Sequence, residues 1–530
     1  MSDAFDVVVI GGGHNGLVAA ALLAKRGASV VVLERRAQVG GAAVTEQPWG
    51  PQYNVTALSY VVSLMPPTIS RELELARHGY HVYPQGGYFA PHRDGRCLQL
   101  TPEGIEQFSA RDVDAFERWE AWLAGVADVL GPLLTTVPPR LGSVHPRDLA
   151  DQSRLAWKLR RLGVAGVADV TRLFTSSIAD LLDDWFESPQ MHGVLSVSGV
   201  IGTWAGPRSA GTAYVMAHHK IGDVGDGELG HWGFPRGGMG GVTRALRDAA
   251  ESFGAKVRTD ASVARIDVRS GRVRGVVLES GEELRADVVV AAIHPKITFL
   301  DQIDRADLPT DFVAAIERWK SRSGTVKVNV AVDRLPEFRA KPGFDPDVHG
   351  GTIVLAESLD DIEGAFQDAV AGRPATLPFA DVCIPSVFDD SLAPGGHHIV
   401  SMFTQWVPHE WASKPDGSAL DAYADRVIAR VDDVAPGFAD SVLHRQVIGP
   451  YEMEHEYGLV GGNIFHGELS PGQLFHMRPA PGYADFRTPI AGLYQASSAT
   501  HGGGGVTGIP GMNAVQQILR DRRGRRRSRA

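Results

Sequence analysis

A glycine-rich stretch near the start of the chain carries the clearest chemical signal. Residues 11–16 read Gly-Gly-Gly-His-Asn-Gly and hold the G-x-G-x-x-G spacing. Gly11 permits a tight turn, Gly13 lets the backbone approach a pyrophosphate, and Gly16 lets the following helix pack on the preceding strand. The first N–H groups of that helix would face the phosphates. Glu34 would accept hydrogen bonds from a ribose with free hydroxyls and would repel a 2′-phosphate. The spacing therefore predicts a dinucleotide site that disfavours NADP.

A second glycine-rich stretch lies close to the other end of the chain. Residues 502–505 are all glycine. A backbone without side chains can lie against a flat ring. A helix that starts near Gly511 or Met512 would direct its positive N-terminal end at the same ligand. We therefore expect this stretch to contribute to the cofactor site through Gly504, Gly505, Gly511 and Met512.

Candidates for the chemical step are few. His466 and His501 lie in distinctive blocks of sequence, although most histidines are structural. Lys327 stands among apolar residues of a predicted strand, where it either holds a water near the cofactor or faces solvent. Arg236 is either a substrate anchor or a structural ion pair. The sequence contains no catalytic triad, carboxylate pair or metal-ligand spacing, so we predict no metal site and leave the catalytic residues unassigned.

The hydrophobic pattern predicts the elements that would position these residues. Residues 6–10 and 29–33 are β-branched runs typical of buried parallel strands, and residues 15–26 between them have the composition of a helix. This is a βαβ unit. Further strands are predicted at 255–259, 262–269, 272–279, 283–291, 325–332, 397–404 and 490–496, with helices at 240–250 and 511–520.

Residues 101–190 are predicted to be mostly helical. They carry four tryptophans, and the stretch 119–138 is apolar but interrupted by two acidic residues and a proline. Three interpretations of that stretch stay open: a helical cap over a substrate cavity, a membrane-surface patch, or ordinary core.

The length of 530 residues predicts two domains. We place a discontinuous dinucleotide-binding domain at residues 1–100, 225–300 and 470–530. A substrate-binding domain with a helical cap takes residues 101–224 and 301–469. The fold class is thus α/β, with a Rossmann-like domain and a second, mixed-sheet domain.

The charge and the cysteine content of the chain indicate the cellular compartment in which it works. The chain has a net charge of −10, yet seven of its last eleven residues are arginine. We expect this basic tail to be a disordered, solubilising end; an anionic lipid surface is the alternative, and no nucleic-acid motif accompanies it. The two cysteines, Cys97 and Cys383, form no CxxC pair, which fits a reducing compartment. No signal peptide or membrane-spanning run is visible, so we expect a cytoplasmic protein, with peripheral contact to a membrane left open.

Together these blocks resemble the phytoene desaturase and carotenoid isomerase branch of the flavin amine oxidase-like proteins. The resemblance spans nearly the whole chain and is carried by residues 6–43, 201–207, 211–214, 235–241, 461–468, 477–482 and 500–511. It implies a bound FAD and a Rossmann-like domain of the amine-oxidase (GR2) type. The residues it assigns to FAD in the first part of the chain are Gly11, Gly13, His14, Asn15, Gly16, Glu34, Arg35, Gly40, Gly41 and Ala42.

The resemblance also implies details of cofactor contact and of activity. Val263 would meet the adenine through its backbone, whereas Ser497, Ala499 and Gly502 depart from the family pattern at the glycine loop. The implied reaction is hydride transfer from an apolar, unsaturated substrate to flavin N5, with oxygen or a quinone as electron acceptor. A flavin-dependent isomerase and a non-catalytic flavoprotein acting as a binding partner are the alternatives. An amine oxidase would need an aromatic cage that the sequence does not place.

Overall fold

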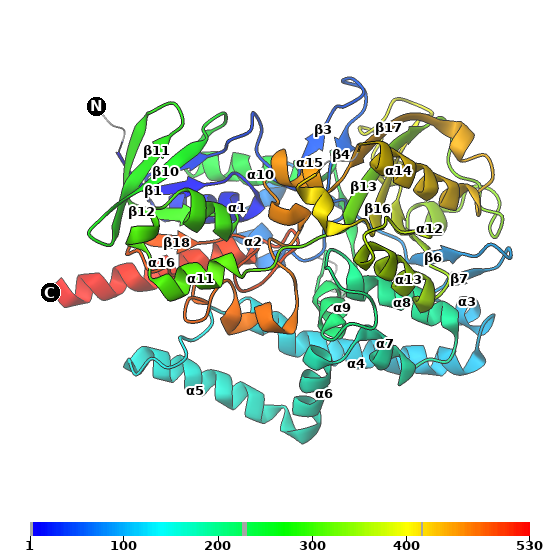
Figure 1. Cartoon of the computed structure of the whole chain (residues 1–530), viewed down its shortest axis with the longest axis horizontal. Helices are drawn as coiled ribbons and strands as arrows, with labels where there is room; N and C mark the ends of the chain where they lie inside the picture. Colours follow the sequence, from blue (N-terminus) through cyan, green and yellow to red (C-terminus); the bar gives the residue numbers. More distant parts are fainter. Residues whose placement is uncertain (1–3, 225–229, 415–416, 530) are drawn as a thin grey trace.

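Two seven-stranded sheets form the frame of the molecule in the computed structural model, which describes residues 4–224, 230–414 and 417–529 (Figure 1). Two short two-stranded sheets lie outside this frame. Their strands are β3 (Thr45–Glu46) with β4 (Val55–Thr56), and β5 (Val82–Pro84) with β8 (Gly233–Pro235).

The first sheet contains the predicted βαβ unit. Its strand order is β10-β11-β12-β1-β2-β9, with β18 also paired to β12. The central strand β1 runs parallel to both β2 and β12, and its last four residues are fully buried, as expected for a strand covered on both faces. The bounds are β1 Ala4–Ile10, β2 Val30–Leu33, β9 Lys256–Arg258, β10 Val263–Arg269, β11 Arg272–Leu278, β12 Glu283–Ala291 and β18 Leu493–Gln495.

Helices cover both faces of this sheet. On one face Leu17 and Leu246 share a core cluster with Val7 of β1. On the other face Phe312 packs in a cluster with Val8. The covering helices are α1 (His14–Ala24), α10 (Met239–Ser252) and α16 (Ile509–Arg529) on the first face, and α11 (Thr310–Glu317) on the second.

The second sheet is mixed, as predicted. Its order is β17-β13-β16-β15-β14-β6-β7, and every neighbouring pair is antiparallel except β14 with β6. The strands are β6 Tyr88–Pro91, β7 Cys97–Gln99, β13 Thr325–Val332, β14 Thr352–Leu355, β15 Phe379–Cys383, β16 His398–Gln405 and β17 Val442–Ile448. Helices around this sheet and in the connections are α2 Pro67–Glu72, α12 Pro346–His349, α13 Leu359–Val370, α14 Gly417–Asp432 and α15 Pro450–His455.

The remaining helices lie below the two sheets in the view of Figure 1, with α5 beneath the half of the molecule that contains α16. They are α3 Pro102–Glu106, α4 Ala110–Leu134, α5 Pro146–Arg161, α6 Gly163–Thr175, α7 Ile178–Asp183, α8 Pro189–Val200 and α9 Thr212–Lys220. Trp119, Leu123 and Leu130 of α4 are buried in the same core cluster as the second sheet. The stretch 119–138 is therefore largely core rather than a membrane-surface patch.

Two details differ from what the sequence predicted, and a third is not described by the structure. Strands β6 and β7 belong to the second sheet, although they precede residue 100, where we placed the end of the first segment. The predicted boundary at residue 225 lies outside the described residues. The arginine-rich end continues α16 to Arg529 instead of being unstructured. In the part of the chain that is described, no helix combines the length and apolar character needed to cross a membrane.

Candidate active site

A deep cleft opens at the carboxyl ends of β1 and β2, where open α/β sheets bind their ligands. It encloses about 1400 Å³ of open space. Most of the residues predicted to bind the cofactor line it together. They are Gly11, Gly13, His14, Asn15, Glu34, Arg35, Gly40, Gly41, Ala42 and Val263.

Each glycine of the first turn has a different structural role. Gly11 has a φ of +97°, and a Cβ there would come within 2.7 Å of the Ile293 side chain. A Cβ on Gly16 would overlap the Gly11 carbonyl oxygen, so the close packing of α1 on the turn requires glycine, as predicted. A Cβ on Gly13 would meet no protein atom within 4 Å. The space beside Gly13 is therefore left for a ligand, which fits a dinucleotide whose pyrophosphate lies against bare backbone.

The walls of the cleft near the predicted ribose are held by hydrogen bonds. The buried Glu34 accepts one from the Gly12 N–H through Oε2 at 2.8 Å. Arg35 donates through Nη2 to two backbone carbonyls at the end of α15, at 3.1 and 2.8 Å, and so closes the cleft rather than reaching into it. The Val263 carbonyl accepts from the Gln302 side chain at 2.8 Å. The ribose contact of Glu34 and the adenine contact of Val263 stay predictions.

Three histidines line the same cleft: His294 is buried, and His14 and His466 are half-buried. Each has a buried ring nitrogen, Nε2 in His14 and His294 and Nδ1 in His466, that finds no hydrogen-bond partner among the described residues. Burial lowers the pKa of His14 to about 4 and that of His466 to about 3, so both rings are neutral near pH 7. Neutral rings can present either N–H donors or acceptors to a ligand. Sequence reasoning missed His294, which follows β12 without any local motif.

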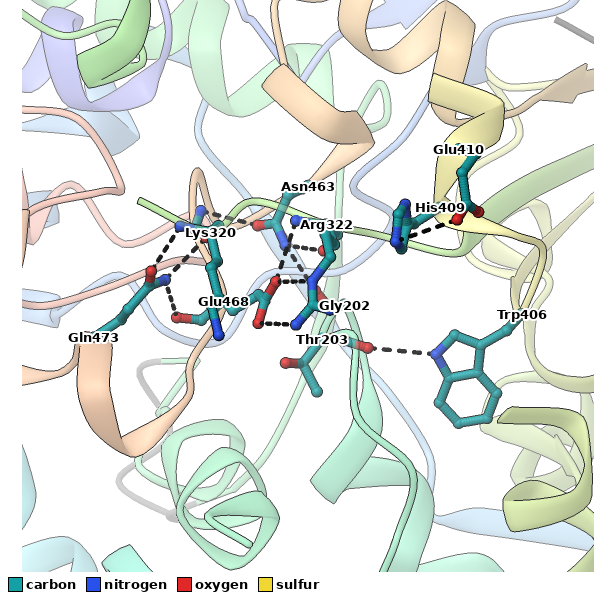
Figure 2. Close-up of polar contacts among 11 residues, drawn as sticks. Gly202, Thr203, Lys320, Arg322, Trp406, His409, Glu410, Asn463, Glu468 and Gln473 are labelled. Carbon is teal, nitrogen blue, oxygen red and sulfur yellow. Dashed lines mark hydrogen bonds and ion pairs between the residues drawn. The ribbon is translucent and has the colours of Figure 1, made fainter. Parts of the chain in front are cut away.

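The backbone of the block around His466 is held by Asn463, which Figure 2 shows beside Arg322 and Glu468. The Asn463 Oδ1 accepts hydrogen bonds from the N–H groups of Phe465 and Gly467, both at 3.0 Å. Its Nδ2 donates to the Arg322 carbonyl at 2.9 Å. These hydrogen bonds of Asn463 stabilise the unusual backbone φ of +56° at His466. The Glu468 carboxylate, also in Figure 2, pairs with the Arg322 guanidinium at 2.7 Å.

A fully buried guanidinium joins this block to the C-terminal loop. Arg478 has no carboxylate partner among the described residues, and burial lowers its pKa. Its nitrogens donate to backbone carbonyls on both sides, including Phe465 at 3.0 Å and Ser498 at 2.9 Å. Backbone carbonyls thus take the place of a counter-ion. Arg478 is a positioning residue that sequence reasoning did not identify.

The glycine-rich C-terminal loop adjoins the first turn, as the sequence predicted, and its glycines lie close to protein atoms. A Cβ on Gly504 would overlap the Phe465 ring, and one on Gly511 would overlap the Asn15 carbonyl. Met512 packs against the core beside α1. Of the described residues that line the cleft, none is Gly504, Gly505, Gly511 or Met512, and their contact with the cofactor stays a prediction. The loop contributes Ser498 instead, whose Oγ accepts from Asn15 Nδ2 at 3.2 Å.

A second, largely apolar cavity adjoins the dinucleotide cleft. It encloses about 1060 Å³ and shares the wall residues His14, Ala42 and Ile464 with the cleft. Gly505 lines this cavity, not the cleft. The other walls are mainly aliphatic and aromatic side chains, among them Leu58, Val62, Leu64, Tyr88, Ile201, Trp232, Phe403 and Phe465.

A small polar group interrupts the apolar walls. Lys327 on β13 and Asp381 on β15 both stand opposite Phe403 of β16, so the three side chains share one face of the second sheet. The Lys327 ammonium lies over the Tyr60 ring, 4.4 Å from its centre, and donates to Ser401 Oγ. The Tyr60 hydroxyl donates to Asp381 Oδ2 at 2.7 Å. Asp381 Oδ1 is buried with no partner among the described residues.

Burial controls the charge of this group. It lowers the pKa of Lys327 to about 7, so the amine exchanges its proton near neutral pH. It raises the pKa of Asp381 to about 6 against the opposing effect of the Tyr60 hydrogen bond. Lys327 therefore faces the cavity rather than solvent, which decides between its two predicted positions. Tyr60 and Asp381 were not identified from the sequence.

Two weaker candidates lie elsewhere. His501 Nε2 is 2.9 Å from the Leu133 carbonyl at the end of α4, and His501 lines neither cavity within the described residues. Arg236 is exposed and also absent from the described walls of both cavities, so it cannot anchor a substrate in either. Across the described residues, no group of three or more His, Cys, Asp or Glu side chains is arranged to hold a metal ion.

The fold and the two adjoining cavities define a class of oxidoreductase that binds a dinucleotide on a Rossmann-like sheet and its substrate beside a second sheet. Comparison with known protein families supports this assignment. Residues 9–71 match the NAD(P)-binding Rossmann-like domain, and residues 186–512 match the flavin containing amine oxidoreductase family. The chain belongs to this family of oxidoreductases, and its cofactor is FAD.

Similar proteins extend over nearly the whole chain. Pyridine nucleotide-disulfide oxidoreductase domain-containing protein 2 of Rattus norvegicus is 38% identical, across 98% of this chain and 94% of the relative. A limonene dehydrogenase component of Castellaniella defragrans is 25% identical, across 97% and 94%. The crystal structure of an oxidoreductase from Methanosarcina mazei has the same fold, with a TM-score of 0.61 at 15% identity, covering 97% of this chain and 99% of that one. Disulfide chemistry is not transferred to this chain, because Cys97 and Cys383 are both buried free thiols.

Proposed function

We propose that the protein is a dehydrogenase that removes hydride from an apolar, unsaturated substrate and delivers it to flavin N5. The observation that carries this proposal is the apolar cavity, which shares wall residues with the dinucleotide cleft. Aliphatic and aromatic walls favour a hydrocarbon and keep water away from the reacting atoms. A further support is the relative from Castellaniella defragrans, whose name refers to limonene, an unsaturated hydrocarbon.

The residues of the cavity have distinct proposed roles. When bound, FAD supplies the two-electron acceptor. The cavity walls hold the substrate against the cleft and fix which C–H bond faces it. Removal of hydride leaves a proton to be lost from the neighbouring carbon. We propose that the unprotonated Lys327 amine accepts it at Nζ, because Lys327 lines the cavity and burial lowers its pKa to about 7. Oxygen or a quinone then takes the electrons.

Oxidation of an amine is the second candidate, because the cavity also has features that suit a cation. Tyr60, Trp232 and Phe403 present aromatic rings, and Asp381 has an unpartnered carboxylate oxygen among the described residues. Aromatic faces and a carboxylate together attract alkylammonium groups. The sequence alone did not place such a cage. The Lys327 amine at the same wall disfavours a second cation whenever it is protonated.

Anaerobic reduction of the bound flavin tests these proposals. The purified protein is mixed without oxygen with polyenes, fatty acyl compounds and amines in turn, and the flavin absorbance is followed. The dehydrogenase proposal predicts bleaching by an apolar unsaturated compound and a product that has lost two hydrogens. Bleaching by amines alone would favour the second candidate. An isomerised product without net redox change would support an isomerase, and the absence of any bleaching would support a non-catalytic flavoprotein.

A pair of lysine variants tests the proton-accepting role. Lys327→Met should slow bleaching by an active substrate at least 100-fold while leaving FAD bound. Lys320→Met is the matched control, because its side chain is exposed and lines neither cavity within the described residues. Equal rates in the two variants would remove Lys327 from the proposal.

A further inference from the structure

The helices α5 and α6 form a surface that the rest of the molecule leaves uncovered. Figure 1 shows both helices projecting beneath the body of the protein. Every residue of α5 whose burial is described is at least partly exposed, and Leu173 is the one described residue of α6 that is buried. Short helices in water are marginal without a packed apolar face. The structure therefore raises the question of what covers this pair.

Exposed apolar side chains gather on this pair of helices and on the segment just before α5. Nine large hydrophobic side chains are strongly exposed in the described part of the chain, and six of them fall between residues 141 and 167. Trp157 is 55% exposed and Val164 is 90% exposed. We call this set the apolar rim; its members are Leu141, Val144, Leu149, Trp157, Val164 and Val167. Exposed apolar residues that cluster in this way mark an interaction site.

Positive charge accompanies the apolar rim. Helix α5 contains five basic and two acidic residues, although the whole chain has a net charge of −10. Arg154, Lys158 and Arg161 are spaced i, i+4, i+7 and so form one stripe along the helix. Arg161 lies over the Trp157 ring, 3.9 Å from its centre, which joins the stripe to the rim.

The C-terminal helix adds to the same basic region. Arg520 of α16 is 3.8 Å from Asp151 of α5, so the arginine-rich end of α16 begins beside α5. Residues 520–529 include seven arginines and a single aspartate. The start of the arginine-rich end thus lies beside α5, the helix that carries Leu149 and Trp157 of the apolar rim.

We propose that α5, α6 and the arginine-rich end of α16 bind the surface of an anionic lipid bilayer. Basic residues would contact the head groups, and the apolar rim would enter the boundary with the acyl chains, as in interfacial helices. A second copy of the chain fits less well, because a symmetric contact through this surface would oppose like charges. A nucleic acid would leave the apolar rim exposed, since such interfaces are polar.

Vesicle binding by the FAD-loaded full-length chain tests the proposal. Binding to phosphatidylcholine vesicles that contain phosphatidylserine should exceed binding to pure phosphatidylcholine vesicles and should weaken with added salt. Each basic residue near an anionic surface strengthens binding about fivefold, so the triple variant R154Q/K158Q/R161Q should bind roughly 100-fold more weakly. The triple variant L149S/W157S/V164S should lose at least tenfold on the same vesicles.

Matched variants keep the test independent of folding. F344S/V370S/L443S removes three other strongly exposed apolar side chains, which lie outside the rim, and it should bind vesicles like the parent chain. All variants should retain FAD, because none of these residues lines the cleft or the apolar cavity within the described chain. Brominated lipids should quench tryptophan fluorescence in the parent and less in Trp157→Phe.

Several results would overturn the proposal. Equal binding to neutral and anionic vesicles would show that the basic residues do not contribute. An equal loss of vesicle affinity in the rim variant and in its matched control would show that the apolar rim does not contribute. A concentration-dependent dimer that disappears in the rim variant, without vesicle binding by the parent, would assign the surface to a second copy. Tight binding to a polynucleotide without vesicle binding would assign it to nucleic acid.

Discussion

One added methyl group at Gly13 or at Gly16 should separate cofactor binding from folding. Gly13 has φ −72° and ψ 170°, which any residue adopts, and its added Cβ would meet no protein atom within 4 Å. Gly13→Ala should leave the FAD-free chain at least as stable, with a gain of about 0.4–1 kcal/mol from reduced freedom of the unfolded chain. Gly16→Ala forces its Cβ against the Gly11 carbonyl, and such overpacking costs about 1–3 kcal/mol.

The effect on FAD binding follows from where the methyl group lies. In Gly13→Ala it occupies the part of the cleft where bare backbone is expected to meet the pyrophosphate. Displacing the pyrophosphate from one or two backbone N–H groups loses charge-assisted hydrogen bonds of about 1.5–3 kcal/mol each. A total loss of about 3 kcal/mol weakens FAD binding roughly 100-fold.

Thermal unfolding with and without FAD measures both effects in one assay. At an FAD concentration about 100-fold above Kd, binding should stabilise the parent chain by about 2.7 kcal/mol. Gly13→Ala should lose most of that gain, whereas Gly16→Ala should unfold at a lower temperature even without FAD. A Gly13→Ala variant that FAD stabilises as much as the parent would refute the placement of the pyrophosphate beside Gly13.

Three other changes test the buried polar groups. Burial lowers the pKa of Lys327 from 10.5 to about 7, so the unfolded chain binds more protons there between these pH values. Stability should therefore rise with pH across that window, by on the order of a few kcal/mol, and this rise should be missing from denaturant unfolding of Lys327→Met. Tyr60→Phe removes a hydrogen bond that lowers the pKa of Asp381, so the protonated carboxyl band in infrared spectra should persist to a higher pH than in the parent. Arg478→Met leaves buried carbonyls without donors, at about 1–3 kcal/mol each, and an unchanged unfolding midpoint would contradict its positioning role.

The first turn was predictable because all its determinants are local. A β-branched strand, three spaced glycines and a helix follow one another within residues 6–26, and each has the structural reason that the spacing implies. The strands of the first sheet were also predicted from the sequence, as were β13 and β16 of the second sheet, whereas β6, β7, β14, β15 and β17 were not. Pairing between segments remote in sequence could not be predicted, so residues 1–100 were all assigned to the first domain, although β6 and β7 pair in the second sheet.

The polar group in the apolar cavity could not be found in the same way. Tyr60, Lys327 and Asp381 come from segments far apart in sequence, and the register of β13, β16 and β15 brings the last two together. None has a neighbouring motif. Only Lys327 could be identified from its local sequence, because it is a charged residue in an apolar strand. Asp381 could have been identified for the same reason, since β15 is otherwise apolar.

The C-terminal glycines show the limit of composition as a guide to contact. Glycine permits close approach, but sequence does not say whether a ligand or the protein itself comes close. At Gly504 the neighbour is the Phe465 ring, and at Gly511 it is the backbone of α1. The Phe465 segment and the C-terminal loop are joined by the buried Arg478, which donates to carbonyls of both.

The contact between the two cavities is best tested by the spectrum of the bound flavin. The FAD-loaded protein is titrated with naphthalene, an apolar ligand that offers no readily removed hydride, while the visible absorption is recorded. If the apolar cavity meets the flavin end of the cleft, naphthalene should shift the flavin bands, and Leu58→Trp, which narrows only the apolar cavity, should abolish the shift. Naphthalene that binds in that cavity and leaves the flavin spectrum unchanged would contradict the account.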